Sequence, residues 1–148
     1  MKNLINILFF LSLVVTTSSC STGHENKQAT TKKSVASVAK TGEVKVYYFH
    51  TNYRCNTCRT VERSTGEDLK LLYAEAFKDG TMTYQAINIG DTEHQDLVKK
   101  YRIAGQTLLF TRDDKVIDKT AEAFLNATTK PDKWKSIVKD TVEELLDI

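Results

Sequence analysis

Two cysteines separated by two residues, Cys55 and Cys58, lie between a segment typical of a β-strand and a segment typical of a helix. The first segment, 44–50 (VKVYYFH), is rich in β-branched and aromatic residues, which favour a half-buried strand. The run 59–77 carries apolar residues at steps of three and four, which favour a helix. The cysteines should therefore lie at a helix start, where this spacing lets the two sulfur atoms meet. Unpaired N–H groups and the dipole at that end stabilise a thiolate, the nucleophile of disulfide exchange.

The same spacing predicts different roles for the two sulfur atoms. We expect Cys55 to be the attacking, more exposed thiol with a lowered pKa, and Cys58, one turn inside the helix, to be the resolving thiol. Arg54 and Arg59 flank the pair, and Arg63 lies one turn beyond Arg59. These side chains would add positive potential if they face the site.

Two further residues before the pair are candidates for the site. His50 ends the strand segment five residues before Cys55, so it could transfer a proton beside the thiols or be a simple polar boundary. Tyr53 could line the site or cover the edge of the core.

The order of the remaining elements predicts an α/β domain. Gly66 predicts a kink or break near 64–66, and alternation predicts a second strand over 82–89. The other expected elements are a helix opened by a capping box of Thr92 and Gln95, strands over 107–111 and 115–119, and a last helix from Pro131. Strands separated by helices should pair in parallel, and the last two strands should be antiparallel. The expected architecture is a central mixed four-stranded sheet flanked by helices.

The N-terminal part of the chain resembles an export signal followed by a spacer. Residues 1–19 combine Lys2, an apolar run of about twelve residues and small polar residues, as a secretory signal does. The following Cys20 resembles the lipid-carrying cysteine of a bacterial lipoprotein signal. The alternative is ordinary cleavage nearby, with Cys20 lost or left as a spare thiol. The lipoprotein interpretation accounts for the odd cysteine count, with one cysteine for the anchor and two for the domain. It predicts a lipid-anchored protein of the bacterial envelope, exposed to the periplasm or the cell exterior.

The composition of the residues after the signal segment predicts a tether followed by one domain. Residues 20–42 are rich in Ser, Thr and Lys and lack aromatic residues, so we expect a flexible tether, with a short helix possible around 35–38. We expect residues 43–148 to form one domain. The net charge of +2 gives no electrostatic case for a nucleic-acid partner.

The strand VKVYYFH, the motif RCNTC and the segment YRIAGQTLLF together resemble the thioredoxin superfamily over about residues 43–148. The resemblance implies a thioredoxin-like fold. The domain also looks like a subfamily labelled as a nitrophenyl-compound nitroreductase subunit, a label that we do not adopt as the activity. Superfamily members usually hold a substrate backbone with a cis-proline loop that faces the cysteines. Here that loop reads Ala104-Gly105-Gln106-Thr107, so Gln106 and Thr107 become the supporting residues, with Gln106 expected in trans or the loop rebuilt.

Two other features of the superfamily are absent from this sequence. The buried acidic residue of the strand before the motif is missing, and Tyr48 and Phe49 occupy that region. No tryptophan precedes the first cysteine, and Tyr53-Arg54 stands there instead.

The sequence thus predicts an oxidoreductase that acts on protein thiols or disulfides together with a redox partner, without a bound cofactor. Three alternatives stay open: a structural disulfide, a non-catalytic accessory subunit, and a copper or zinc carrier. A metal site would need ligands besides the cysteines. His50 is the best third ligand, since His24 lies in the tether and His94 near a helix start. We assign no metal site.

Overall fold

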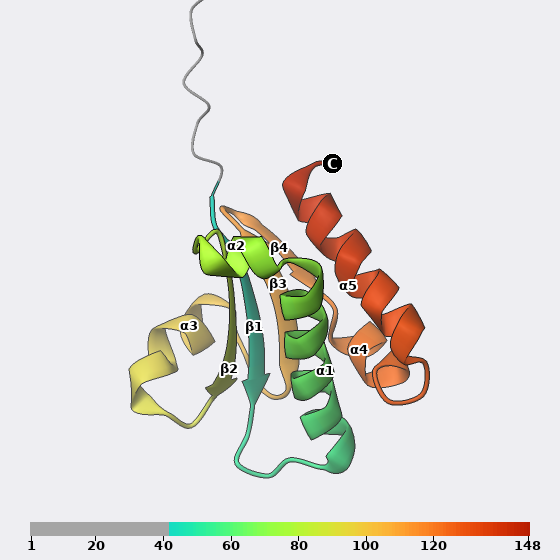
Figure 1. Ribbon diagram of the computed structural model, residues 1–148. Helices are drawn as coiled ribbons and strands as arrows, with labels where there is room; N and C mark the ends of the chain where they lie inside the picture. Colours follow the sequence, from blue (N-terminus) through green and yellow to red (C-terminus); the bar gives the residue numbers. More distant parts are fainter. Residues whose placement is uncertain (1–41) are drawn as a thin grey trace, which may run out of the picture. The chain divides into compact units, whose positions relative to one another are not determined.

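Four strands form a mixed sheet in the order β2-β1-β3-β4 (Figure 1). The computed structural model describes residues 42–148. The predicted signal segment 1–19, the lipid-carrying Cys20, and the tether up to residue 41 with its possible short helix lie outside the described residues. The strands are β1 (Val44–His50), β2 (Met82–Asn88), β3 (Thr107–Arg112) and β4 (Lys115–Asp118). Within the described range, no helix has both the length and the apolar character needed to span a bilayer.

The strand directions differ in part from the expectation of parallel pairing. β1 is parallel to β2, but β3 is antiparallel to β1 and β4 is antiparallel to β3. The connection between β2 and β3 contains the helix α3 (Gln95–Lys100). It brings the chain to the end of β1, where Thr107 pairs with Phe49. β3 therefore runs back along β1 in the opposite direction and ends beside the start of β1, where Arg112 pairs with Val44.

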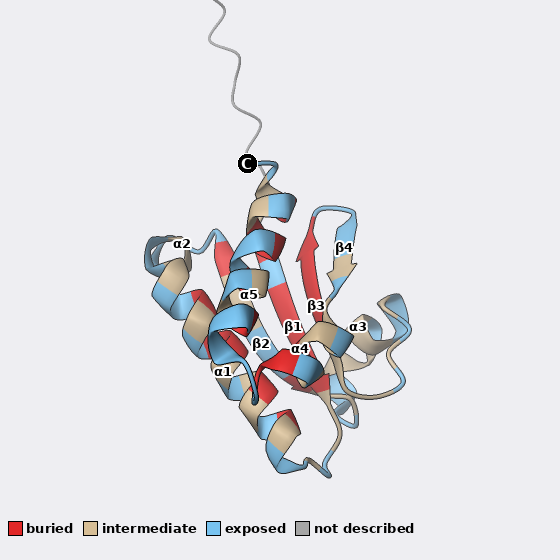
Figure 2. Ribbon diagram, turned by 90° about the vertical axis from the view of Figure 1, so that its right-hand side faces the viewer, coloured by how far each residue is buried: buried red, intermediate tan, exposed pale blue. Residues whose placement is uncertain are grey.

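The two faces of the sheet are covered unequally (Figure 1). One face carries α1 (Asn56–Leu72), α4 (Thr120–Asn126) and α5 (Pro131–Leu146), and the main core lies beneath them. The other face carries α3 over a small cluster made of Tyr47, Phe49, Ile87 and Leu109. Because side chains of a strand alternate between faces, β1 is buried on both sides. Figure 2 shows β3 buried over most of its length and β4 largely exposed at the sheet edge.

Helix α1 continues through Gly66, so the predicted kink or break near 64–66 was wrong. A Cβ atom at Gly66 would lie 2.8 Å from Cε1 of Tyr84, closer than real side chains approach. Glycine is therefore present because the Tyr84 ring packs against the helix. The break falls instead at Tyr73, whose φ of −129° and ψ of 38° separate α1 from α2 (Ala74–Lys78).

Two local predictions need correction. The capping box at Thr92 does not form: residues 92–94 make a 3₁₀ turn, and the Gln95 amide donates to the carbonyls of Ile89 and Asp91 at 2.9 and 3.0 Å. Helix α4 was not predicted. It begins where the Asp118 carboxylate accepts hydrogen bonds from the backbone N–H and the hydroxyl of Thr120.

Candidate active site

The two cysteines lie at the start of α1, beyond the end of β1. Cys55 is the N-cap residue and Cys58 belongs to the first turn. Their Sγ atoms are 2.9 Å apart, and the backbone N–H of Cys58 donates to the Cys55 Sγ at 3.4 Å. The separation exceeds the S–S bond length of about 2.05 Å, so the structure describes two free thiols in contact. Cys55 is exposed, whereas the side chain of Cys58 is buried.

The surroundings shift the two thiol pKa values in opposite directions. The hydrogen bond from the Cys58 side chain, followed by backbone N–H groups of the first helical turn, lowers the pKa of Cys55. Burial, together with the hydrogen bond to Cys55, raises the pKa of Cys58. A thiolate therefore forms first on the sulfur that solvent and a partner can reach.

The arginines contribute less positive potential than their number suggests. Arg54 is paired with Glu62, and Arg63 is paired with Glu67 at 3.9 Å. Arg59 is exposed and has no ion-pair partner among residues 42–148. The lowered pKa of Cys55 accordingly comes from hydrogen bonds at the helix start, and none of its main causes is an arginine.

The segment between β1 and Cys55 is held by a chain of hydrogen bonds. His50 donates from Nδ1 to the Thr51 carbonyl at 3.1 Å, and the Thr51 hydroxyl donates to the Tyr53 carbonyl at 3.0 Å. The Tyr53 side chain is 91% exposed, so it does not cover the core and stands in solvent two residues before Cys55.

The predicted loop residues adjoin this segment. The Gln106 amide donates to the Thr51 hydroxyl at 3.3 Å, and the Thr107 hydroxyl donates to the Gly105 carbonyl at 3.2 Å. Throughout the described range the peptide bonds are trans, that of Gln106 included. Gln106 therefore joins the loop before β3 to the segment that precedes Cys55.

Two tyrosines beneath the site were not predicted as site residues from the sequence. The Tyr48 hydroxyl donates to the Cys58 carbonyl at 3.0 Å, and the Tyr84 hydroxyl donates to the Glu62 carbonyl at 2.7 Å. Burial raises the pKa of both phenols, so both remain neutral donors. The alternation of side chains along the strands could have indicated these two residues, because it places Tyr48 and Tyr84 on the same face of neighbouring strands.

The structure offers little for a metal ion. Among residues 42–148 no three His, Cys, Asp or Glu side chains gather in a group that could hold one. His94 is paired with Glu93 at 3.2 Å, and His24 lies outside the described residues.

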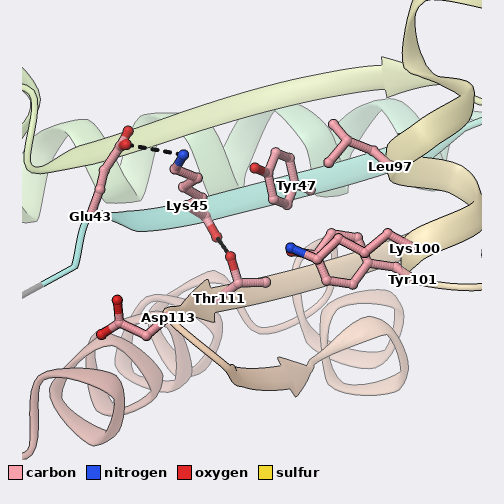
Figure 3. Close-up of a pocket in the computed structure, with 8 residues that line it drawn as sticks. All are labelled: Glu43, Lys45, Tyr47, Leu97, Lys100, Tyr101, Thr111 and Asp113. Atoms are coloured by element: carbon pink, nitrogen blue, oxygen red, sulfur yellow. Dashed lines mark hydrogen bonds and ion pairs between the residues drawn. The ribbon is translucent and has the colours of Figure 1, made fainter.

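A cavity of about 470 Å³ lies on the face of the sheet that α3 covers (Figure 3). Its walls come from β1 and the residue before it, from β3 and the turn after it, and from α3 with its C-cap. The lining residues are Glu43, Lys45, Tyr47, Leu97, Lys100, Tyr101, Thr111 and Asp113. Neither cysteine lines it, so it does not belong to the thiol site.

Comparison with known proteins found distant likenesses among solved structures. No protein-family model matches the chain, and no curated protein matches it. The thioredoxin Deadhead of Drosophila melanogaster is 19% identical, with a TM-score of 0.38 over 51% of this chain and 65% of that one, which is less than two thirds of its length. Thioredoxin f2 of Chlamydomonas reinhardtii is 12% identical, with a TM-score of 0.34 over 59% and 77% of the two chains. A malarial protein is 16% identical, with a TM-score of 0.33 over 56% and 93%.

The class of the domain follows from its own architecture. The strand order β2-β1-β3-β4 and a cysteine pair at the start of the helix after the central strand β1 define a thioredoxin-like α/β fold, as the sequence predicted.

Proposed function

We propose that this domain is a thiol–disulfide oxidoreductase in which Cys55 attacks and Cys58 resolves. One observation carries the proposal: an exposed thiol with a lowered pKa lies 2.9 Å from a buried thiol at a helix start. A structural disulfide closing so small a loop would constrain the unfolded chain little. It would also not need one sulfur open to solvent.

The proposed reaction balances without a bound cofactor. The Cys55 thiolate attacks one sulfur of a substrate disulfide, that S–S bond breaks, and the leaving thiolate takes up a proton. The Cys58 thiol then loses its proton to water, and its thiolate attacks the Cys55 sulfur of the mixed disulfide. The bond between Cys55 and the substrate breaks, and the second substrate sulfur leaves as a thiolate that takes up a proton from water. The substrate gains two electrons, and the domain ends with a Cys55–Cys58 disulfide. A redox partner restores the dithiol. With a dithiol substrate, the same steps run in reverse.

We also propose that the protein acts in the bacterial envelope, held at the membrane by lipid on Cys20. The support is the signal-like segment 1–19 and the small residues before Cys20. Protein thiols or disulfides outside the cytoplasm would then be the substrates. In cells, Cys20→Ala should move the chain from the membrane fraction to the soluble fraction. A membrane fraction unchanged by this substitution would contradict the proposed anchor.

The activity is tested by trapping the mixed disulfide. The full chain with Cys58→Ser, in a Cys20→Ser background, is reduced and then incubated with insulin, whose disulfides serve as the probe. Because Cys58 can no longer resolve the adduct, we expect a covalent complex through Cys55 that a reductant releases. Adding Cys55→Ser should abolish the complex.

The same assay distinguishes the alternatives. Absence of any adduct with Cys58→Ser, under conditions where Cys55 can still be alkylated, would contradict the oxidoreductase. Copper or zinc retained on purification in that case would favour a carrier.

A further inference from the structure

Two tyrosines fasten the first turns of α1 to the sheet. Tyr48 on β1 donates to the Cys58 carbonyl, and Tyr84 on β2 donates to the Glu62 carbonyl, which lies four residues further along the same helix. Four residues make about one helical turn. The two hydroxyl groups therefore hold successive turns of one helix on two neighbouring strands.

Both hydrogen bonds join a tyrosine hydroxyl to a carbonyl of α1, but one ends on Cys58 and the other on Glu62. Each phenol reaches a helix carbonyl, which can accept a second hydrogen bond because its oxygen has two lone pairs. Tyr48 is fully buried, and after burial, which raises its pKa most, the charges of Cys58, Glu62, Arg54 and Cys55 act on that pKa. The charges that act on the pKa of Tyr84 come from Glu62, Tyr48 and Arg54, and from neither cysteine. Only the Tyr48 bond ends on a residue of the pair.

A hydrogen bond to the sheet matters more for Cys58 than for Cys55. Cys55 is the N-cap residue, exposed, and must move its sulfur to meet a substrate. Cys58 must instead stay where its sulfur can reach Cys55 after that movement. The two sulfur atoms, 2.9 Å apart as thiols, must approach to about 2.05 Å to form the bond.

Resting on the proposed function, we propose that Tyr48 is a positioning residue for the resolving thiol: its buried hydroxyl, bonded to the Cys58 carbonyl, keeps the Cys58 sulfur in place to attack Cys55. Tyr48 does not exchange electrons or accept the proton. It acts through Cys58, and the step it supports is the intramolecular one, in which the Cys55–Cys58 bond forms and the bond to the substrate sulfur breaks.

The test compares Tyr48→Phe with Tyr84→Phe, a matched control that loses the same kind of hydrogen bond one turn further from the pair. In the full chain with Cys20→Ser, the mixed disulfide of Cys55 with glutathione is formed and its resolution by Cys58 is timed. We expect Tyr48→Phe to slow resolution about tenfold, the worth of one hydrogen bond of about 1.4 kcal/mol. Tyr84→Phe should resolve at close to the wild-type rate, although both variants lower the melting temperature.

Equal slowing by the two substitutions would mean that the tyrosines act only through stability, and no slowing by Tyr48→Phe would mean that the anchor is irrelevant. Either result overturns the inference and leaves the oxidoreductase intact. If oxidised glutathione gives the wild-type pair neither a mixed disulfide nor a Cys55–Cys58 disulfide, the proposed function fails and the inference fails with it.

Discussion

Replacing Trp134 by alanine is expected to lower the free energy of unfolding by about 3–5 kcal/mol, the usual cost of removing a large buried aromatic side chain. Trp134 lies in α5, is fully buried, and belongs to the core between the sheet and the helices α1, α4 and α5. That core also supports the helix on which the cysteines lie. Urea unfolding followed by circular dichroism measures the loss, provided that the slope of the transition is unchanged.

Trp134→Phe is the matched control, because the indole N–H has no hydrogen-bond partner among the described residues. Phenylalanine keeps most of the apolar volume and removes a buried donor that costs free energy while unpaired. It should therefore cost much less than alanine. Equal losses for the two variants would contradict the expectation that the unpaired indole N–H contributes no stabilising hydrogen bond.

Cys58→Ala is expected to raise the pKa of Cys55. The main cause of the lowered pKa is the hydrogen bond from the Cys58 side chain, and alanine removes that donor. A lowered pKa means that more thiolate is present at a given pH, so its loss moves the alkylation curve of Cys55 to higher pH. The rate of iodoacetamide reaction between pH 5 and 10 measures the shift in a Cys20→Ser background, where Cys55 is the exposed thiol of the reference chain and the sole thiol of the variant.

Two further variants separate the hydrogen bond from general electrostatics. Cys58→Ser keeps a hydroxyl donor and should shift the curve less than alanine does. Arg63→Ala removes an exposed charge that is paired with Glu67, so the curve should stay in place. A curve that moves with Arg63→Ala but not with Cys58→Ala would show that the arginines, and not the neighbouring thiol, lower the pKa of Cys55.

The elements next to the cysteines were predictable because their sequence signals are local. The β-branched and aromatic run over 44–50 forms β1 as expected, and Pro131 begins the last helix. The fold class followed from the order of these elements. By contrast, the direction of β3 depends on which end of β1 the chain meets after α3, and no local sequence pattern defines that.

The errors within the helices have two different causes, a tertiary contact at Gly66 and the short length of α4. Gly66 reads as a helix breaker by propensity, but its role is to admit the Tyr84 ring from a strand far along the chain. Helix α4 has only seven residues, too few for a clear periodic pattern.

The site was predictable only where adjacent residues form it. The positions of Cys55 and Cys58 follow from their spacing, whereas Tyr48 acts through a hydrogen bond between β1 and α1 that only the folded chain brings together. The ion pair of Arg54 with Glu62 likewise joins residues on either side of the motif, and it removes an arginine from the expected positive field.

The proposed pairing of the two thiols is tested by the equilibrium of the full chain, with Cys20→Ser, in glutathione buffers of increasing oxidised fraction, followed by mass spectrometry. We expect a single transition in which Cys55 and Cys58 lose their thiols together and the chain loses two hydrogen atoms, because the two sulfur atoms already touch. Independent reaction of the two cysteines, with a stable glutathione adduct accumulating on each, would show that they do not act as a redox pair.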